Sequence, residues 1–243
     1  MVNNMKKVEL KTFFEKIGYD WKKDEETMKV ICGLTKTRPK ENIEDFRFTD
    51  GHEQTFFMKA LAEQHGSKSF FEIGTGRGTA CYALSLLDEM EEIVTVDVVP
   101  HEQKKPEAIN YRPVMVSNAD LYDMVPYEQK SKISFLMRGA LPNLLRERSG
   151  HFDLCFIDGD HDNHRIIIED YYFCTKVLKE GGVIVFDDYH PTRFSVKSIV
   201  DRILETDTKL NAYLILHSGH LFDTEKAATE RGMVVVSYND LGI

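Results

Sequence analysis

Several features that would assign this 243-residue chain to a specialised class are missing from it. No apolar run approaches the roughly 18 residues of a membrane-spanning helix. The lysines near the N-terminus are not followed by the apolar stretch of a secretion signal. Positive charge is not in excess, because the net charge is −9, which disfavours nucleic acid and anionic membranes as partners. We therefore expect a soluble protein that binds neither.

The chain also has only four cysteines, and they form no C-x-x-C pair. Cys155 and Cys174 lie in apolar runs, where a free thiol packs as a small core side chain. This pattern is typical of a reducing compartment rather than of a disulfide framework. A cytoplasmic location is the corresponding expectation, and a homo-oligomer is compatible with it.

Short, continuous apolar runs recur from residue 69 onward and alternate with helical patterns. They lie at Phe70–Ile73, Ile93–Val96, Ile133–Met137, Leu154–Ile157 and Val183–Phe186. Such runs are typical of strands that are buried on both faces. Two further strand-like runs, Ala212–Leu216 and Met233–Ser237, indicate a hairpin-like pair at the sheet edge. The order predicts an α/β, doubly wound, mostly parallel sheet with helices on both faces.

The first part of the chain is more polar and carries helical patterns at Val8–Ile17 and Glu25–Ile31. We expect residues 1–49 to form a small helical appendage and residues 50–243 to form the main domain. The connection from Pro100 to Lys132 is long for a crossover between two strands. It is either a functional lid or a solvated insertion.

A glycine-rich turn follows the first buried strand, in FFEIGTGRGTA. Glu72, Gly74, Gly76 and Gly78 form the pattern E-x-G-x-G-x-G, whose glycines let the backbone turn tightly and approach a ligand. A dinucleotide fingerprint needs G-x-G-x-x-G, and Thr79 stands at its third small position. A carboxylate two residues before the first glycine suits a cofactor with a positive end better than a pyrophosphate.

Asp97 ends the second strand, in IVTVDVV. A carboxylate at this position can accept hydrogen bonds from both ribose hydroxyls of a nucleoside. Taken alone, Asp97 could equally cap the strand. Together with the glycine turn upstream, ribose binding is the better interpretation.

These two elements resemble the S-adenosylmethionine-binding half of the class I methyltransferases. Gly139-Ala140 is similar to that family's adenine-side turn, and the resemblance covers roughly residues 50–240. It implies a seven-stranded sheet with an antiparallel last strand. It also implies S-adenosylmethionine as the cofactor, bound by Glu72, Gly74, Thr75, Gly76, Gly78, Asp97, Val98, Gly139, Ala140 and Asp158.

Acidic residues and histidines follow the fourth strand, in FIDGDHDNH (residues 156–164). They could form a metal-binding catalytic edge, a calcium loop or a polar turn. The calcium loop fails because Asn163 replaces the obligatory glycine and LCFI before it is a strand rather than a helix. For Asp160, Asp162 and His164 we accept the polar turn, with His164 starting or capping the next helix.

Asp158 and His161 differ, because the fifth strand ends in Asp187 and Asp188. Neighbouring strands lie about 4.8 Å apart, and ligands bind beyond the carboxyl ends of parallel strands. Three carboxylates at one edge would repel one another, and a hard cation such as Mg²⁺ relieves that repulsion. The metal can lower the pKa of a substrate hydroxyl while His161, neutral at pH 7, removes the proton.

This arrangement resembles the metal-dependent O-methyltransferases of the catechol and macrolide-sugar (macrocin-like) types. The resemblance makes Asp158, Asp187 and Asp188 the metal ligands and His161 the general base, and D-G-D-H is closer to the macrolide-sugar type. The strand-five pair is Asp-Asp in place of Glu-Asp or Asp-Asn, so Asp187 ligates either directly or through water. The implied reaction is methylation of a small-molecule hydroxyl with Mg²⁺ or Mn²⁺.

Other functions remain open on the same residues. A metal-independent methyltransferase would keep His161 as the base, and a nucleotide-responsive binding protein would keep the pocket without turnover. A nicotinamide dehydrogenase agrees less well with the glycine spacing. Asp50-Gly51-His52 suits a helix-capping turn better than a cofactor contact, whereas His190 and Arg193 either face the substrate or belong to a loop.

Overall fold

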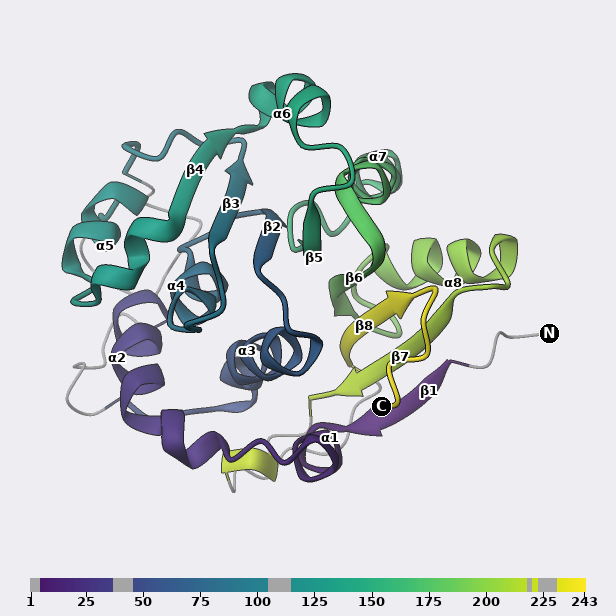
Figure 1. The fold of residues 1–243 in the computed structure, drawn as a ribbon, viewed down its shortest axis with the longest axis horizontal. Coiled ribbons are helices and arrows are strands. Elements are labelled where there is room, and N and C mark those ends of the chain that lie inside the picture. Colours follow the sequence, from purple (N-terminus) through teal and green to yellow (C-terminus); the bar gives the residue numbers. More distant parts are fainter. Residues whose placement is uncertain (1–4, 37–45, 105–114, 218–219, 223–230) are drawn as a thin grey trace.

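The computed structural model describes residues 5–36, 46–104, 115–217, 220–222 and 231–243. Within them lies an eight-stranded sheet in the order β1-β7-β8-β6-β5-β2-β3-β4, with helices on both faces (Figure 1). The strands are β1 (Lys6–Glu9), β2 (Ser69–Ile73), β3 (Glu92–Asp97), β4 (Ile133–Met137), β5 (Phe152–Ile157), β6 (Leu178–Tyr189), β7 (Asn211–Leu216) and β8 (Gly232–Ser237). The helices are α1 (Leu10–Ile17), α2 (Glu25–Lys36), α3 (Glu53–His65), α4 (Thr79–Ser85), α5 (Asn118–Met124), α6 (Leu141–Glu147), α7 (His164–Val177) and α8 (Val196–Thr206). Short 3-10 helices are η1 (Trp21–Asp24), η3 (Asp50–His52), η4 (Glu128–Lys132), η5 (Arg138–Ala140) and η6 (His220–Phe222).

The strand directions confirm the α/β, doubly wound prediction. β8 runs antiparallel to both of its neighbours, β6 and β7. The remaining strand pairs of the described sheet are parallel. The antiparallel last strand is therefore confirmed as well.

The predicted number of seven strands is wrong by one. Lys6–Glu9 forms β1, which pairs with β7 in the register Val8 to Ile215. We expected helix from Val8, but α1 begins at Leu10. The short sequence KKVE has one apolar residue and therefore no strand period that could be recognised. As a consequence the β7–β8 pair lies one strand inside the edge.

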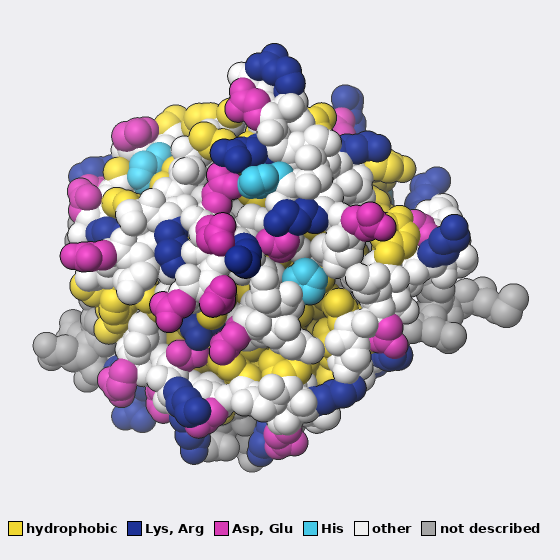
Figure 2. Space-filling view, in the orientation of Figure 1, with side chains coloured by type: hydrophobic (Ala, Val, Ile, Leu, Met, Phe, Trp, Pro, Cys, Tyr) yellow, Lys and Arg dark blue, Asp and Glu magenta, His cyan; other side chains and the backbone are white. Residues whose placement is uncertain are grey.

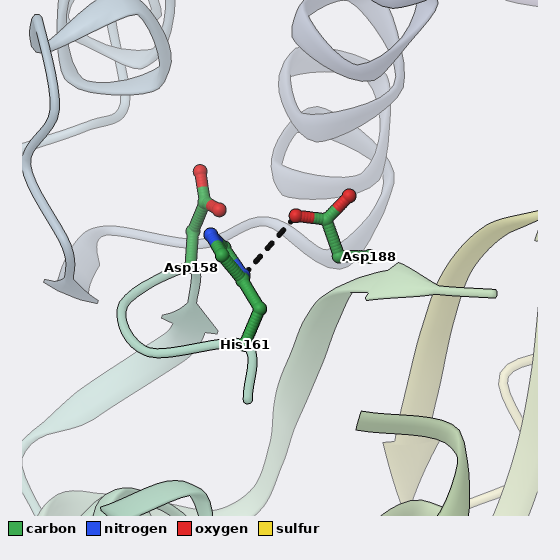
Figure 3. Close-up of side chains that lie close together, drawn as sticks. All are labelled: Asp158, His161 and Asp188. Carbon is green, nitrogen blue, oxygen red and sulfur yellow. Dashed lines mark ion pairs between the residues drawn. The ribbon is translucent and has the colours of Figure 1, made fainter. Parts of the chain in front are cut away.

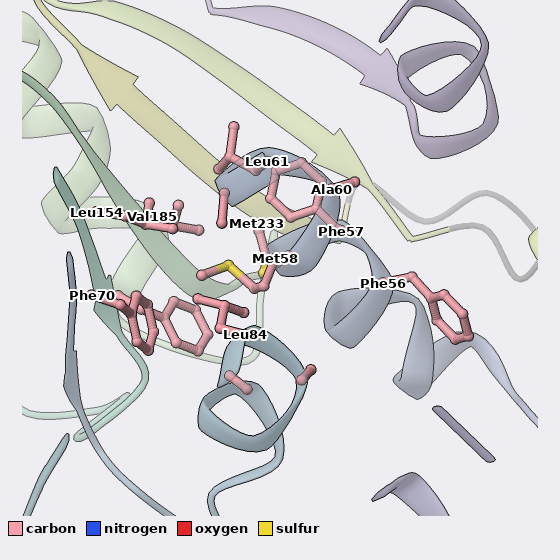
Figure 4. Close-up of a cluster of buried hydrophobic side chains, with 14 of the residues drawn as sticks. Phe56, Phe57, Met58, Ala60, Leu61, Phe70, Leu84, Leu154, Val185 and Met233 are labelled. Atoms are coloured by element: carbon pink, nitrogen blue, oxygen red, sulfur yellow. The ribbon is translucent and has the colours of Figure 1, made fainter. Parts of the chain in front are cut away.

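The core consists of two layers, one on each face of the sheet. Successive strand residues point to opposite faces, so Phe70 belongs to one cluster of buried side chains and Phe71 to the other. Helices α1 to α4 cover the first face, and α6 to α8 cover the second. Figure 4 shows Met58 and Leu61 of α3 in the first cluster, with Leu154 of β5. The four cysteines are buried and free.

The N-terminal helices belong to the first of these clusters. Phe13 of α1 and Met28 of α2 are fully buried in it. Trp21 packs edge-on against Phe56 and Phe222, with ring centroids 5.8 and 5.4 Å away. These aromatic side chains therefore pack the N-terminal segment onto the sheet domain. The division into an appendage and a main domain at residue 49 stays a prediction.

Two further expectations concern the surface and the connections. In the described part of the chain, no helix combines the length and the apolar character needed to cross a membrane. Acidic and basic side chains are interspersed over the face seen in Figure 2. The long connection before β4 contains α5 and η4, whereas residues 105–114 lie outside the described residues. Whether this connection acts as a lid stays a prediction.

Candidate active site

The carboxyl ends of four neighbouring parallel strands form one edge of the sheet. Ile73 at the end of β2 is in register with Val96 of β3 and with Ile157 of β5. Ile157 is in turn in register with Phe186 of β6. The residues that follow these positions therefore meet at one edge, where open α/β sheets bind ligands.

Gly74 is required by the close approach of β2 to β5. Its φ is +98°, and a Cβ at this position would lie 2.1 Å from the backbone oxygen of Asp158. Its N–H donates to the carbonyl of Val96 (2.8 Å), and the N–H of Asp158 donates to that of Ile73 (2.8 Å). The first glycine of the turn thus serves the packing of three strand ends.

The rest of the glycine turn helps to position the side chain of Asp97. Gly76 and Gly78 also have positive φ, at +52° and +75°. The N–H of Gly76 donates to Oδ2 of Asp97 (3.2 Å), and the N–H of Val99 donates to Oδ1 (3.0 Å). Two backbone donors therefore orient the carboxylate, which is half-buried, beside the exposed Val98.

Glu72 lies beneath the turn and is almost completely buried. Its Oε2 accepts hydrogen bonds from Thr95 Oγ1 (2.5 Å) and Cys81 Sγ (3.0 Å). Thr75 Oγ1 is 2.7 Å from the same Thr95 hydroxyl. Burial raises the pKa of Glu72 to about 7, against the effect of these hydrogen bonds.

Two cavities flank the glycine turn. The smaller, of about 330 Å³, has Glu72 and Thr75 in its wall, and the larger, of about 510 Å³, has Asp97 and Val98. The residues that they share are Gly74, Gly76, Asp158 and His161. Their volumes lie in the range of small-molecule and cofactor sites.

The structure alters the prediction for the adenine-side turn. Gly139 and Ala140 lie in η5 and do not line the larger cavity, whereas Arg138, just before them, does. Arg138 forms an ion pair with the buried Asp170 of α7. Burial raises the pKa of Asp170, and the guanidinium of Arg138 acts against that rise.

Asp158, His161 and Asp188 come together at the shared wall of the cavities (Figure 3). One possible ligand atom from each lies within 4.8 Å of the others. His161 Nδ1 is 3.1 Å from Asp188 Oδ2. Burial, and next the charges of Asp187 and Asp188, raise the pKa of Asp158 well above its usual value.

Asp188 has a conformation that few side chains adopt. Its φ of +54° places it in the left-handed region, where it is the single non-glycine residue among those described. Such strain costs on the order of 1–3 kcal/mol and is concentrated at functional sites. Arg231 also approaches its carboxylate, with 3.7 Å between Nη2 and Oδ1.

Asp187 is not one of this group of three, although its charge acts on Asp158. Its Oδ2 accepts a hydrogen bond from Nε2 of Gln54 (2.8 Å). Burial and the charge of Asp188 raise the pKa of Asp187 to about 6. The structure therefore brings together two of the three predicted metal ligands, with His161. Direct or water-mediated ligation by Asp187 stays a prediction.

The neighbouring polar residues have structural partners. Oδ1 of Asp160 accepts the N–H groups of Asp162 (2.9 Å) and Asn163 (2.7 Å), as expected of a polar turn. Asn163 caps α7, and His164 is its first residue. Nδ1 of His190 accepts the N–H of Arg193 (3.0 Å), so His190 belongs to a loop.

The expected capping turn at residues 50–52 is present as η3, where Thr49 and His52 form a capping box. The sequence did not indicate three further residues of the cavity walls. Lys36 and Gln54 line the smaller cavity, and Arg138 lines the larger one. For Arg138, its position directly before Gly139 was an available signal. Lys36 and Gln54 lie far from the motifs in sequence and have no local signal.

Residues 71–189 match the model of a family described as "Methyltransferase domain". A protein of Dictyostelium discoideum named "Probable caffeoyl-CoA O-methyltransferase 3" is 25% identical over 165 residues, 67% of this chain and 59% of that protein. An uncharacterized protein of Acanthamoeba polyphaga mimivirus is 26% identical over 131 residues, 52% of this chain and 54% of that protein. The chain thus spans less than two thirds of the length of either relative.

Solved structures share the fold. The O-methyltransferase TomG from Streptomyces achromogenes, in complex with SAM, has a TM-score of 0.53 at 18% identity, with 79% of this chain and 82% of that chain covered. The O-methyltransferase from Bacillus cereus, in complex with SAH, has a TM-score of 0.50 at 17% identity, with 76% and 80% covered. Residues 71–189 of this chain thus resemble a methyltransferase domain, and the chain shares its fold with these two O-methyltransferases.

Proposed function

We propose that this protein transfers a methyl group from S-adenosylmethionine to a hydroxyl oxygen of a small molecule, with His161 as the general base. The observation that carries the proposal is the meeting of the two cavities at Asp158 and His161, next to the glycine turn. The nucleoside end would lie in the larger cavity beside Asp97. The amino acid end would lie in the smaller one beside Glu72.

The residues fit this cofactor. Asp97 presents a carboxylate whose orientation is set by the N–H groups of Gly76 and Val99, as a ribose diol requires. Glu72 offers a buried carboxyl to a cationic ligand. A bound sulfonium supplies an activated methyl group, so the protein has to position the acceptor and to remove its proton.

His161 is placed to remove that proton. Its Nδ1 lies against the carboxylate of Asp188, a contact that fixes the tautomer in which Nδ1 carries the hydrogen. Nε2 is then the basic nitrogen. It would accept the proton of the acceptor hydroxyl as the oxygen takes the methyl group, and Asp188 would stabilise the resulting imidazolium.

A divalent cation also fits the group of three. Asp158 and Asp188 would hold it, because their oxygens lie close together. Burial is the main cause of the raised pKa of Asp158, and the negative charges of Asp187 and Asp188, which a cation would offset, come next. When bound, Mg²⁺ or Mn²⁺ would lower the pKa of the acceptor hydroxyl. A metal-independent reaction is the second candidate, favoured by the 3.1 Å contact between His161 and Asp188, which forms a base and its orienting group without a metal.

Calorimetric titration of S-adenosylhomocysteine tests the cofactor site. We expect Asp97→Ala to weaken binding by at least about 100-fold, since two charge-assisted hydrogen bonds of about 1.5–3 kcal/mol each are lost. The control is Asp162→Ala, which removes an exposed aspartate of the nearby loop and should leave the affinity unchanged. Absence of binding to the unmodified protein would contradict the proposed function.

The same titration with Mg²⁺ separates the two mechanisms. A heat of Mg²⁺ binding that Asp188→Ala abolishes and Asp162→Ala preserves would support the metal-assisted reaction. Binding of the cofactor product without any Mg²⁺ or Mn²⁺ heat would favour the metal-independent candidate.

A further inference from the structure

Part of the smaller cavity is built by the N-terminal segment. Lys36 is the last residue of α2, and Gln54 lies in the first turn of α3; both line the cavity wall together with Glu72 and Asp158. In the sequence, these two positions lie far from the strands that carry the motifs. Their presence in the wall shows that the segment before β2 contributes to the site itself.

Lys36 reaches the cavity with its charge unpaired by any described carboxylate. Its Nζ donates to the backbone oxygen of Gly51 (3.1 Å) and to Oε1 of Gln54 (3.2 Å), both of which are neutral. An ammonium has three donors, so one N–H remains beyond these two contacts. In the described part of the chain Lys36 forms no ion pair.

The wall of the cavity therefore carries charge of both signs. Glu72 and Asp158 supply carboxyl groups, and the ammonium of Lys36 contributes a positive field. That field acts against the rise in the pKa of Glu72 caused by burial. The positive end of the α3 dipole lies next to Lys36, because Gln54 and Thr55 line the same wall. A ligand with both an ammonium and a carboxylate matches this distribution.

We propose that Lys36 binds the carboxylate at the amino acid end of S-adenosylmethionine. This inference rests on the proposed function, which places that end in the smaller cavity. The remaining N–H of Lys36 would donate to the carboxylate, and the ammonium of the ligand would face Glu72. Gln54 would position Lys36, since its two amide atoms contact Lys36 and Asp187 at the same time.

In a simpler alternative, Lys36 has a structural role only and balances the negative charge of the acidic groups around it. The two roles differ in which ligand depends on Lys36. S-adenosylhomocysteine has the amino acid end, whereas 5′-methylthioadenosine keeps the nucleoside and the thioether and lacks that end. A carboxylate-binding lysine affects the first ligand alone, and a lysine that maintains the shape of the cavity affects both.

Calorimetric titration of both ligands into the full chain makes this comparison. We expect Lys36→Met to weaken S-adenosylhomocysteine about 10- to 100-fold, the range of one hydrogen bond between charged groups. For 5′-methylthioadenosine the change should stay within about twofold. Lys29→Met removes a lysine from the same helix that does not line the cavity, and it should change neither affinity.

Equal weakening of both ligands by Lys36→Met, or no weakening of either, would overturn the inference while leaving the cofactor site intact. If the unmodified protein binds neither ligand, the proposed function itself fails. Thermal melting shows whether each variant is folded. If Lys36→Met does not fold, Lys36→Gln carries the same expectation, since it keeps a hydrogen-bond donor and removes the charge.

Discussion

At the scale of single residues, Gly74 and Gly76 of one turn have different reasons to be glycine. A Cβ on Gly74 would lie 2.1 Å from the backbone oxygen of Asp158. A Cβ on Gly76 would meet nothing within 4 Å, so its requirement is the positive φ alone. One glycine therefore joins two strands, and the other shapes the loop around a ligand.

We expect Gly74→Ala to lower the free energy of unfolding by more than about 3 kcal/mol, because the clash with β5 adds to the backbone strain. Gly76→Ala is the matched control and should cost about 1–2 kcal/mol, the price of a left-handed residue. Urea unfolding followed by circular dichroism measures both. Equal losses would show that β2 and β5 can separate to accommodate a methyl group.

At the scale of elements, the N-terminal helices have the packing of core elements. Phe13 and Met28 are fully buried in the cluster that also contains strand residues such as Phe70. The end of α2 is also tied to the glycine turn: Arg77 donates to the backbone oxygen of Thr35 (3.0 Å). These contacts predict that α1 and α2 unfold together with the sheet.

The buried Met28 and the exposed Met124 provide a matched pair for testing that expectation. Met28→Ala should lower the free energy of unfolding by about 2–5 kcal/mol, and Met124→Ala by less than about 0.5 kcal/mol. Trp21, the one tryptophan of the sequence, reports on the N-terminal segment by fluorescence, whereas circular dichroism reports on the whole chain. The two transitions should coincide and shift together. An earlier, separate fluorescence transition would instead support an independent appendage.

At the scale of the whole molecule, the buried carboxyl groups of the site make stability depend on pH. Burial raises the pKa of Glu72 from 4.5 to about 7, and that of Asp187 from 3.8 to about 6. At a pH between its pKa in the unfolded chain and its pKa in the folded protein, each group is protonated in the folded state and ionised in the unfolded state. The free energy of unfolding therefore falls as the pH rises through this interval.

Glu72→Gln removes one of these groups and should flatten the dependence. Relative to the unmodified protein, the variant should gain about 3 kcal/mol between pH 4.5 and pH 7.5, since one pKa unit corresponds to about 1.4 kcal/mol. Urea unfolding in a chelating buffer at several pH values measures this difference. Glu89→Gln, at an exposed position, should show no such trend. A constant difference for Glu72→Gln would mean that Glu72 titrates normally in the folded protein.

Local sequence patterns predicted most of the strands. They failed where the extent of a strand depends on pairing with a neighbouring strand rather than on its own amino-acid composition. The run Val183–Phe186 is the centre of β6, which begins five residues earlier at Leu178. Gly182 lies in this early part of the strand, where a Cβ would be 2.9 Å from the backbone oxygen of Asp153. Pairing with β5 therefore determines the start of this strand.

By itself, the sequence determined the parallel sheet, the glycine turn and the acidic residues at the strand ends, because these depend on short apolar runs and on the residues next to them. Only the tertiary structure decided that Asp188 rather than Asp187 faces His161, and that Lys36 and Gln54 complete the cavity. Gln54 and Asp187 are 133 positions apart in the chain. No local pattern encodes such a contact, since it arises only when the helices pack on the sheet.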